Sequence, residues 1–122
     1  MASVGERFAA AVAAKDVSEL NALLSDDVDF KALTPQRLWE ATGPDEVADV
    51  FFGSWFTADD AIEGVTAVPG DDVADTSHVG YRFDVTTPDG PHVVEQQAYY
   101  RELENRICYI RIVCSGFRPA PA

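Results

Sequence analysis

The sequence predicts an α+β fold in which helices come first and a long antiparallel sheet follows. Two observations carry this prediction. Apolar residues recur at helical spacing early in the chain, whereas β-branched and aromatic residues fill three runs near its end. The turn signals Thr87-Pro88-Asp89-Gly90 and Glu104-Asn105 separate those runs, as expected for an antiparallel meander.

Three helices are expected ahead of the meander. The first covers Ser3–Ala14, where apolar residues at helical spacing lie among alanines of high helix propensity. The second is short and begins at a cap formed by Asp16 or Ser18. The third begins at residues 42–46, where a capping threonine, a proline and two acids favour a helix N-terminus, and it runs to about Phe56.

The remaining runs predict six strands and a single domain. The strands are expected over Val28–Leu33, Arg37–Ala41, Ala61–Val68, Val73–Thr86, His92–Leu103 and Arg106–Cys114. Residues 1–116 would form the domain, and the proline-containing residues 117–122 would form a flexible C-terminal tail.

Composition argues against several classes of partner and binding site. The 122 residues carry a formal net charge of -12, which argues against nucleic acids and anionic membrane surfaces as partners. The chain lacks an apolar run of the roughly 20 residues that span a bilayer, and its N-terminus does not resemble a signal peptide. Cys108 and Cys114 lie too far apart on one predicted strand to form a disulfide, which suits a cytoplasmic location. Metal-binding and nucleotide-binding motifs are missing, so we expect no metal and no cofactor.

Four segments carry a resemblance to a known family. They are Arg7-Phe8 to Lys15-Asp16-Val17, Leu23-Leu24-Ser25-Asp26-Asp27-Val28, Gly43-Pro44-Asp45-Glu46-Val47, and Asn105-Arg106-Ile107 to Arg111. In their order and spacing the chain resembles the nuclear transport factor 2-like superfamily, which includes SnoaL-like and ketosteroid isomerase-like proteins. The resemblance implies a cone-shaped cystatin-like roll, in which a curved, mostly antiparallel sheet wraps three N-terminal helices around a hydrophobic pocket. It also implies a homodimer through the convex face of the sheet.

The same resemblance bears on catalysis. Ketosteroid isomerases use a carboxylate base and a tyrosine with a protonated aspartate as oxyanion donors. Segment matching places Phe8 at the tyrosine, Ala32 at the base and Gln97 at the aspartate. Phenylalanine cannot donate a hydrogen bond and alanine cannot accept a proton, so that isomerase chemistry is expected to be absent.

The matching also predicts the faces of two strands. Val93, Glu95, Gln97, Tyr99 and Arg101 are expected on the concave side, together with three residues of the last strand: Cys108, Ile110 and Ile112. Tyr100, Tyr109, Val94 and Val113 would then form the convex contact of a homodimer.

Candidate site residues follow from these faces. The catalytic candidates are His78, Gln97 and Glu95, with His78 included because histidine is the usual acid or base near neutral pH. A structural ion pair between Glu95 and Arg82 is the alternative for Glu95. The candidate ligand-binding residues are mainly aromatic, and core packing is the alternative for Trp55; they are Phe8, Trp39, Phe51, Trp55, Tyr81, Tyr99, Ile110 and Ile112.

Two functions remain open at this point. One is a cofactor-independent enzyme, such as an isomerase, cyclase, dehydratase or epoxide hydrolase, that acts on an apolar ring or polyketide-like substrate. The other is a non-catalytic module of the same fold that binds a small apolar ligand or forms a dimer.

Overall fold

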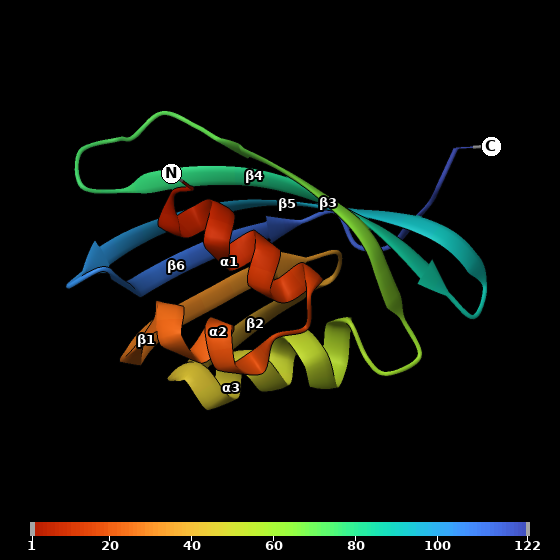
Figure 1. Ribbon diagram of the computed structural model, residues 1–122, viewed down its shortest axis with the longest axis horizontal. Helices are drawn as coiled ribbons and strands as arrows, with labels where there is room; N and C mark the ends of the chain where they lie inside the picture. Colours follow the sequence, from red (N-terminus) through yellow and green to blue (C-terminus); the bar gives the residue numbers. More distant parts are fainter. Residues whose placement is uncertain (1, 122) are drawn as a thin grey trace.

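The protein is a curved sheet that bends around its helices, as the computed structural model of residues 2–121 shows (Figure 1). The helical elements are α1 (Val4–Ala13), α2 (Val17–Leu23), α3 (Pro44–Ala48) and the π-helix η1 (Asp49–Trp55) that continues α3. The strands are β1 (Leu24–Thr34), β2 (Arg37–Thr42), β3 (Ala61–Pro69), β4 (Ser77–Thr87), β5 (Gly90–Leu103), β6 (Arg106–Cys114) and β7 (Arg118–Pro119).

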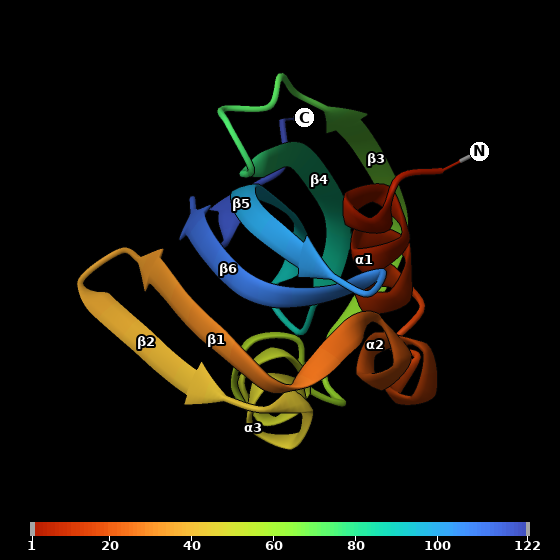
Figure 2. The same cartoon turned by 90° about the vertical axis from the view of Figure 1, so that its left-hand side faces the viewer.

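The sheet is mostly antiparallel, which confirms the predicted fold class. Its strands follow the order β2-β1-β6-β5-β4-β3, and β7 pairs with β5 at one end. All neighbours are antiparallel except β1 and β6, which pair in parallel, as the long stretch of chain between them permits. Figure 2 shows the sheet curling around α1 and α3, so that its concave face and the helices enclose the core.

The helices begin where the sequence predicts. Ser3 and Glu6 form a capping box at the start of α1, which satisfies backbone N–H groups that have no partner within the helix. The Asp16 side chain accepts a hydrogen bond from the backbone N–H of Glu19 and caps α2. At α3 the N-cap is Gly43, which has no side-chain capping bond, so the expected threonine cap is wrong; Pro44 occupies the first turn, where its missing N–H costs nothing.

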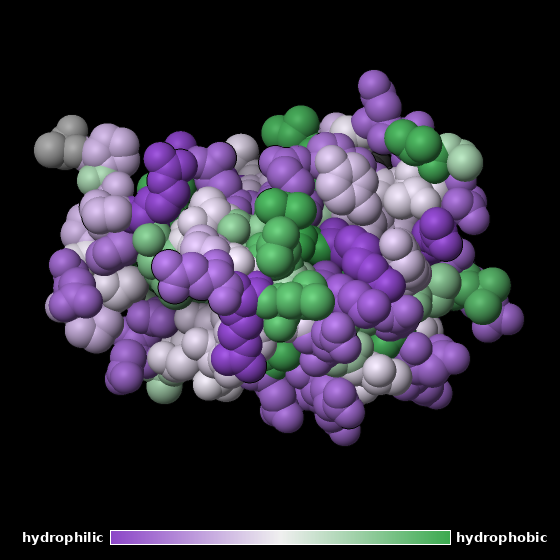
Figure 3. Space-filling view, turned by 180° about the vertical axis from the view of Figure 1, so that it is seen from behind, coloured by the Kyte–Doolittle hydropathy of each residue, from purple (hydrophilic) through white to green (hydrophobic). Residues whose placement is uncertain are grey.

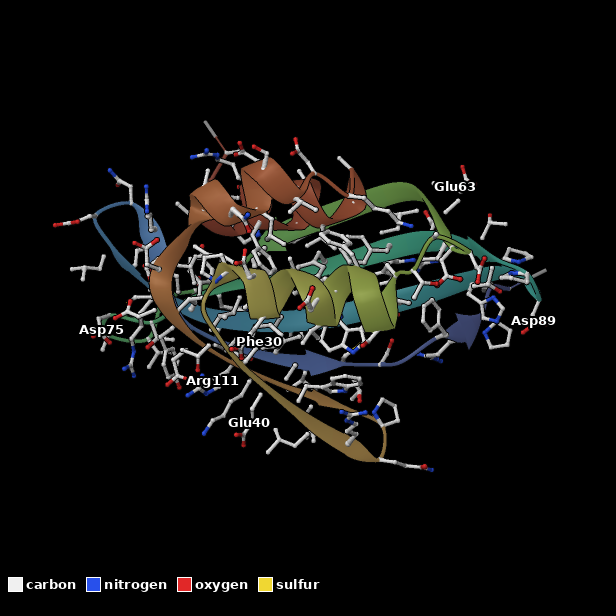
Figure 4. The ribbon with its side chains drawn as sticks, turned by 90° about the horizontal axis from the view of Figure 1, so that it is seen from below. Phe30, Glu40, Glu63, Asp75, Asp89 and Arg111 are labelled. Atoms are coloured by element: carbon white, nitrogen blue, oxygen red, sulfur yellow. The ribbon has the colours of Figure 1, made fainter. Side chains whose placement is uncertain are left out.

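An aromatic cluster fills the core between helix and sheet. Phe51 on η1 is fully buried, and its ring centroid lies 5.6 Å from that of Phe8, 5.9 Å from Phe30 and 4.8 Å from Trp55. These pairs meet edge to face, the arrangement that aromatic quadrupoles favour. Figure 4 shows Phe30 on β1 directed toward α3. The cluster therefore fixes the helical layer against the concave face.

The faces of β5 are the reverse of the prediction. Its buried inward side chains are Val94, Gln96, Ala98 and Tyr100, whereas Glu95, Gln97, Tyr99 and Arg101 are exposed on the convex side. Val94 and Tyr100 were expected on the convex face, and that expectation is wrong too. Tyr100 reaches α1 instead, where its hydroxyl accepts a hydrogen bond from the backbone N–H of Gly5 at 3.0 Å.

The last strand agrees with the prediction except at one end. Ile110 and Ile112 are buried on the concave side, as expected. Cys108 is not, because a register shift between Arg101 and Glu102 interrupts the ladder there. At this irregularity Ile107 is the fully buried residue, while the Cys108 thiol lies near the backbone carbonyl of Arg101.

The C-terminal segment is paired with the sheet, which differs from the expected free tail. His92 pairs with Pro119 and Val93 with Arg118. The backbone N–H of Ala120 also donates to the carbonyl of Pro91. The segment runs beside Val93, which is buried although it lies on the convex side of β5.

Candidate functional site

A hollow of about 350 Å³ opens at one end of the cone, where four parts of the chain meet. They are the β1–β2 turn, the end of η1, the middle of β5 and the segment after β6. No formally charged residue lines it; the lining consists of Thr34, Pro35, Trp39, Trp55, Phe56, Val94, Gln96, Cys114, Ser115, Gly116 and Phe117. An uncharged, largely aromatic wall with a few polar groups is typical of small-molecule sites.

One buried amide gives the hollow its polar character. Gln96 is 1% exposed and is the one polar residue in the buried core of residues 2–121. The Tyr81 hydroxyl donates to Gln96 Oε1 at 2.6 Å, and Gln96 Nε2 donates to Cys114 Sγ at 3.3 Å. These two contacts hold the amide plane in place. A primary amide carries two N–H donors, and only one of them has a partner among the described residues.

Burial shapes the chemistry of the tyrosine beneath this amide. Desolvation raises the pKa of Tyr81 well above its ordinary value, and the nearby Cys114 adds a smaller effect in the same direction. Tyr81 therefore stays neutral at physiological pH and acts as a hydrogen-bond donor to Gln96. It supports the amide rather than acting as a base.

The rim of the hollow is built around Trp39 on β2. Its indole N–H donates to Thr34 Oγ1 at 2.9 Å, and its ring meets that of Trp55 edge to face at 5.8 Å. The guanidinium carbon of Arg37 lies 3.6 Å from the centre of the Trp39 ring, a cation–π contact. Three neighbours thus fix the orientation of this wall. The Trp55 indole nitrogen is buried and has no hydrogen-bond partner among the described residues.

Two of the three positions matched to ketosteroid isomerase catalysis lie in the interior. Phe8 is fully buried and Ala32 is 1% exposed, so both side chains face the core. The interior position on β5 belongs to Gln96, one residue before the matched Gln97. Neither a carboxylate nor an imidazole belongs to the described lining of the hollow. What this arrangement can do is hold an apolar molecule and donate a hydrogen bond to it.

The three catalytic candidates do come together, but on the convex face. His78, Gln97 and Glu95 line a second, shallower depression of about 630 Å³ over β3, β4 and β5. His78 Nε2 lies 2.5 Å from Gln97 Oε1, and the imidazole stacks on the Tyr99 ring at 4.6 Å. A side chain at Gly80 would place its Cβ 2.8 Å from the Gln97 amide, so this pair depends on a glycine beneath it.

The expected ion pair of Glu95 is not formed as predicted. Glu95 does stand opposite Arg82 in the β4–β5 ladder. The guanidinium of Arg82, however, lies 3.7 Å from the carboxylate of Asp84 on its own strand. Both groups are exposed, so this contact contributes little to stability.

The candidate ligand-binding residues divide among three places. Trp39 and Trp55 line the hollow. Tyr99 lies on the convex face, and five others are buried in the core: Phe8, Phe51, Tyr81, Ile110 and Ile112. Sequence reasoning missed Gln96, Phe56, Cys114 and Phe117. The charge of Glu95 and Arg101 was the available signal, because it places those residues outside and therefore Gln96 inside.

Within residues 2–121, none of the helices combines the length and the apolar character of a membrane-spanning segment.

Comparison with known proteins agrees with this architecture. No curated protein matches the chain. Solved structures do match. A proposed isomerase from Rhodopseudomonas palustris superposes with a TM-score of 0.75 at 17% identity, covering 95% of this chain and 92% of that one.

Two further structures give the same result. An LEH-like epoxide hydrolase of M. tuberculosis has a TM-score of 0.69 at 15% identity, covering 92% of this chain and 80% of that one. A ketosteroid isomerase-like protein from Erwinia carotovora atroseptica has a TM-score of 0.62 at 17% identity, covering 91% and 90%. At such identities these likenesses show the fold alone. The model of the SnoaL-like domain, however, matches residues 5–108. The chain therefore belongs to the SnoaL-like domain family.

Proposed function

We propose that this protein binds a small apolar ring compound, of the polycyclic or polyketide-like kind, in the hollow beneath Trp39 and Trp55. The observation that supports the proposal is an uncharged aromatic hollow whose floor carries a single, buried, oriented amide. Aromatic walls provide contact area to an apolar ring, and one fixed polar group provides orientation.

Gln96 is the group that would donate a hydrogen bond to the ligand. Its Oε1 already accepts from Tyr81, and one N–H is directed to the weak acceptor Cys114 Sγ. A carbonyl or hydroxyl oxygen of the ligand would be a better acceptor than the thiol for an amide N–H. Because Tyr81 already orders the Gln96 amide, hydrogen bonding to a ligand oxygen would cost little conformational entropy of this side chain.

Binding is favoured over catalysis by the same lining. An isomerase, cyclase or dehydratase reaction needs a group that accepts a proton from the substrate. The described lining offers an amide, hydroxyls, indoles and the Cys114 thiol, and it contains no carboxylate or histidine. A non-catalytic ligand-binding module is therefore our first proposal, and an enzyme of the same substrate class is the alternative.

Both tryptophans of the chain line the hollow, so intrinsic fluorescence reports directly on its occupancy. We expect steroid ketones or polycyclic aromatic ketones to change the tryptophan emission and to raise the melting temperature with ligand concentration. Gln96→Leu should weaken ketone binding about tenfold, the value of one lost hydrogen bond. Gln97→Leu, the neighbouring variant on the convex face, is the matched control and should leave binding unchanged.

Two results would overturn the proposal. One is that no apolar ring compound changes the emission or the melting temperature. The other is that Gln97→Leu weakens binding as much as Gln96→Leu, which would move the ligand to the convex depression.

A second proposal concerns the convex face, which we infer to contact a second copy of the chain. One row of residues crosses six paired strands in register: Leu38, Leu33, Val113, Gln97, Gly80 and Val68. Its four aliphatic members are 52–63% exposed. Figure 3 shows hydrophobic residues gathered in a strip down this face with polar residues on both sides.

The neighbouring row supports a second copy as the occupant. Glu40, Lys31 and Arg111 stand next to one another on β2, β1 and β6, so both signs of charge lie on one patch. A two-fold axis brings the same patch of two copies together, and opposite charges can then meet across it. Sedimentation should show a dimer that Val113→Glu converts to monomer. Val17→Glu, an exposed apolar residue on α2, is the control and should leave the dimer intact. A monomeric wild-type protein would contradict the idea.

A further inference from the structure

A cation beside the hollow, Arg37, takes part in no ion pair within residues 2–121. Arg37, Trp39 and Ala41 alternate along β2, so their side chains share one face of the strand. Ala41 is buried in the core, which identifies this face as the concave one. Arg37 is not one of the lining residues, but it is exposed beside the hollow, with its guanidinium carbon 3.6 Å from the ring centre of the lining residue Trp39.

The ion pairs of the described residues leave the Arg37 guanidinium available to bind an anion. Four ion pairs occur within residues 2–121, and they use Arg7, Arg82, Arg101 and Arg111. Arg37 takes part in none of them. Glu40, the acid on the same strand, stands opposite Lys31 on the convex side and points away from the helices (Figure 4).

The position of the guanidinium over the indole ring matters as much as the charge. A guanidinium lying flat on an indole uses its face for the cation–π contact and keeps the N–H groups of its edge free. Those edge donors are the ones that bind a carboxylate through two parallel hydrogen bonds. Trp39 is itself held by Thr34 and Trp55, so the guanidinium is supported by a fixed surface.

We propose that Arg37 determines ligand specificity by selecting ring compounds that carry an anionic group, such as a carboxylate, at the end facing solvent. This inference rests on the proposed binding function and adds the chemical class of the ligand. The ring occupies the uncharged hollow with its inner oxygen near Gln96, and the anionic end meets Arg37 at the rim. Elsewhere the field of a chain with net charge -12 repels anions, so a local cation has a large effect on which ligand enters.

The test uses two probes with the same ring and different charge, naphthalene-carboxylic acid and naphthalene-carboxamide, measured by titration calorimetry at neutral pH and low salt. We expect the wild-type protein to bind the acid about tenfold more tightly than the amide, since charge-assisted hydrogen bonds are the stronger ones. Added salt should reduce this preference. Arg37→Gln should abolish it, and Arg37→Lys, which keeps the charge without the planar fork, should retain part of it.

Arg106→Gln is the matched control, because Arg106 lies at the β5–β6 turn among Ser25, Asp26 and Asp27, away from the hollow. It should leave the preference unchanged. Equal binding of acid and amide by the wild-type protein would overturn the inference while leaving the binding function intact. Equal weakening of both probes by Arg37→Gln would also overturn it, since Arg37 would then act only by holding Trp39. Binding of neither probe would overturn the inference, whereas the binding function is overturned only if the steroid and polycyclic aromatic ketones also fail to change the tryptophan emission and the melting temperature.

Discussion

Gln96 and Gln97 are neighbours on β5, yet their side chains serve opposite faces of the sheet. Gln96 is buried and accepts the Tyr81 hydroxyl hydrogen at 2.6 Å, whereas Gln97 is exposed and pairs with His78. The two residues are identical in chemistry and differ only in burial. Substituting each residue in turn therefore separates the contribution of a buried amide to stability from that of a surface amide.

Gln96→Leu should lower the free energy of unfolding by about 1–3 kcal/mol, because the buried Tyr81 hydroxyl loses its acceptor. Gln97→Leu should change it by less than about 0.5 kcal/mol, the usual effect at an exposed site. Urea denaturation measures both values. Combining Gln96→Leu with Tyr81→Phe should cost less than the sum of the single changes, since no unpaired group then remains. Additive costs would show that the two side chains are not coupled.

Several element boundaries were predicted because they are chemically marked, whereas β1 begins at Leu24 rather than at the expected Val28 and β7 was not predicted. The β6 range Arg106–Cys114 agrees with the prediction, and β5 differs only at its first residues. The expected strand over Val73–Thr86 begins later, at Ser77, because Val73 and Thr76 close a tight turn with each other. Turn residues and caps act locally, so they can be recognised without knowledge of the fold.

The face of β5 was harder to predict because the strand repeats each residue type. Val93-Val94, Gln96-Gln97 and Tyr99-Tyr100 offer the same choice to both sides of the sheet. The alternation of apolar and polar residues therefore does not indicate which set of alternate side chains is buried. Only the remaining residues distinguish the two possibilities: Ala98 suits the core, whereas Glu95 and Arg101 do not.

The hollow was harder still to predict, because its lining includes a contact between segments distant in the sequence. The ring centroids of Phe117 and Phe56 lie 5.8 Å apart there.

Tyr81 should make the protein lose stability at alkaline pH. Burial raises the pKa of the folded-state hydroxyl well above its ordinary value of about 10. Above that pH the unfolded chain releases this proton while the folded chain retains it, so the free energy of unfolding falls as pH rises. The stabilisation is complete below pH ~10 and is lost progressively as the pH rises toward the folded-state value.

Tyr81→Phe provides the comparison for this effect. It removes the titrating hydroxyl, so its stability should fall less steeply above pH ~10 than that of the wild-type protein, by at most about 1.4 kcal/mol per pH unit. Chemical denaturation at a series of alkaline pH values measures the two slopes. The lost hydrogen bond to Gln96 shifts the whole curve of the variant and leaves its slope unaffected. Identical slopes would mean that Tyr81 ionises as readily in the folded state as in the unfolded one.

Phe51 and Phe52 allow a similar comparison on η1. Phe51 is fully buried and contacts rings from α1, β1 and η1, whereas Phe52 is half-buried at the surface. Phe51→Ala should lower the free energy of unfolding by about 3–5 kcal/mol, because it removes contacts and leaves a cavity in the aromatic cluster. Phe52→Ala should cost clearly less. Thermal unfolding followed by circular dichroism ranks the two variants, and a larger loss for Phe52→Ala would contradict the described packing of η1.

Gly5 lets the first turn of α1 lie directly against β4 and β5. A Cβ at this position would come within 2.7 Å of Tyr100 Oη and 2.8 Å of Val79 Cγ1, which is closer than real Cβ contacts allow. In an exposed helix, replacing glycine by alanine stabilises the helix by about 1 kcal/mol. At Gly5 the steric conflict opposes that gain, and we expect Gly5→Ala to lower the free energy of unfolding by about 1–3 kcal/mol.

Gly53 on η1 is the matched control, because a Cβ there meets no atom within 4 Å. Gly53→Ala should therefore leave stability unchanged or raise it by up to about 1 kcal/mol. Urea denaturation of both variants gives the two differences with opposite signs. Stabilisation by both substitutions would mean that α1 can move away from Tyr100 and Val79 at no cost. The hydrogen bond from the Gly5 N–H to the Tyr100 hydroxyl would then not fix the helix on the sheet.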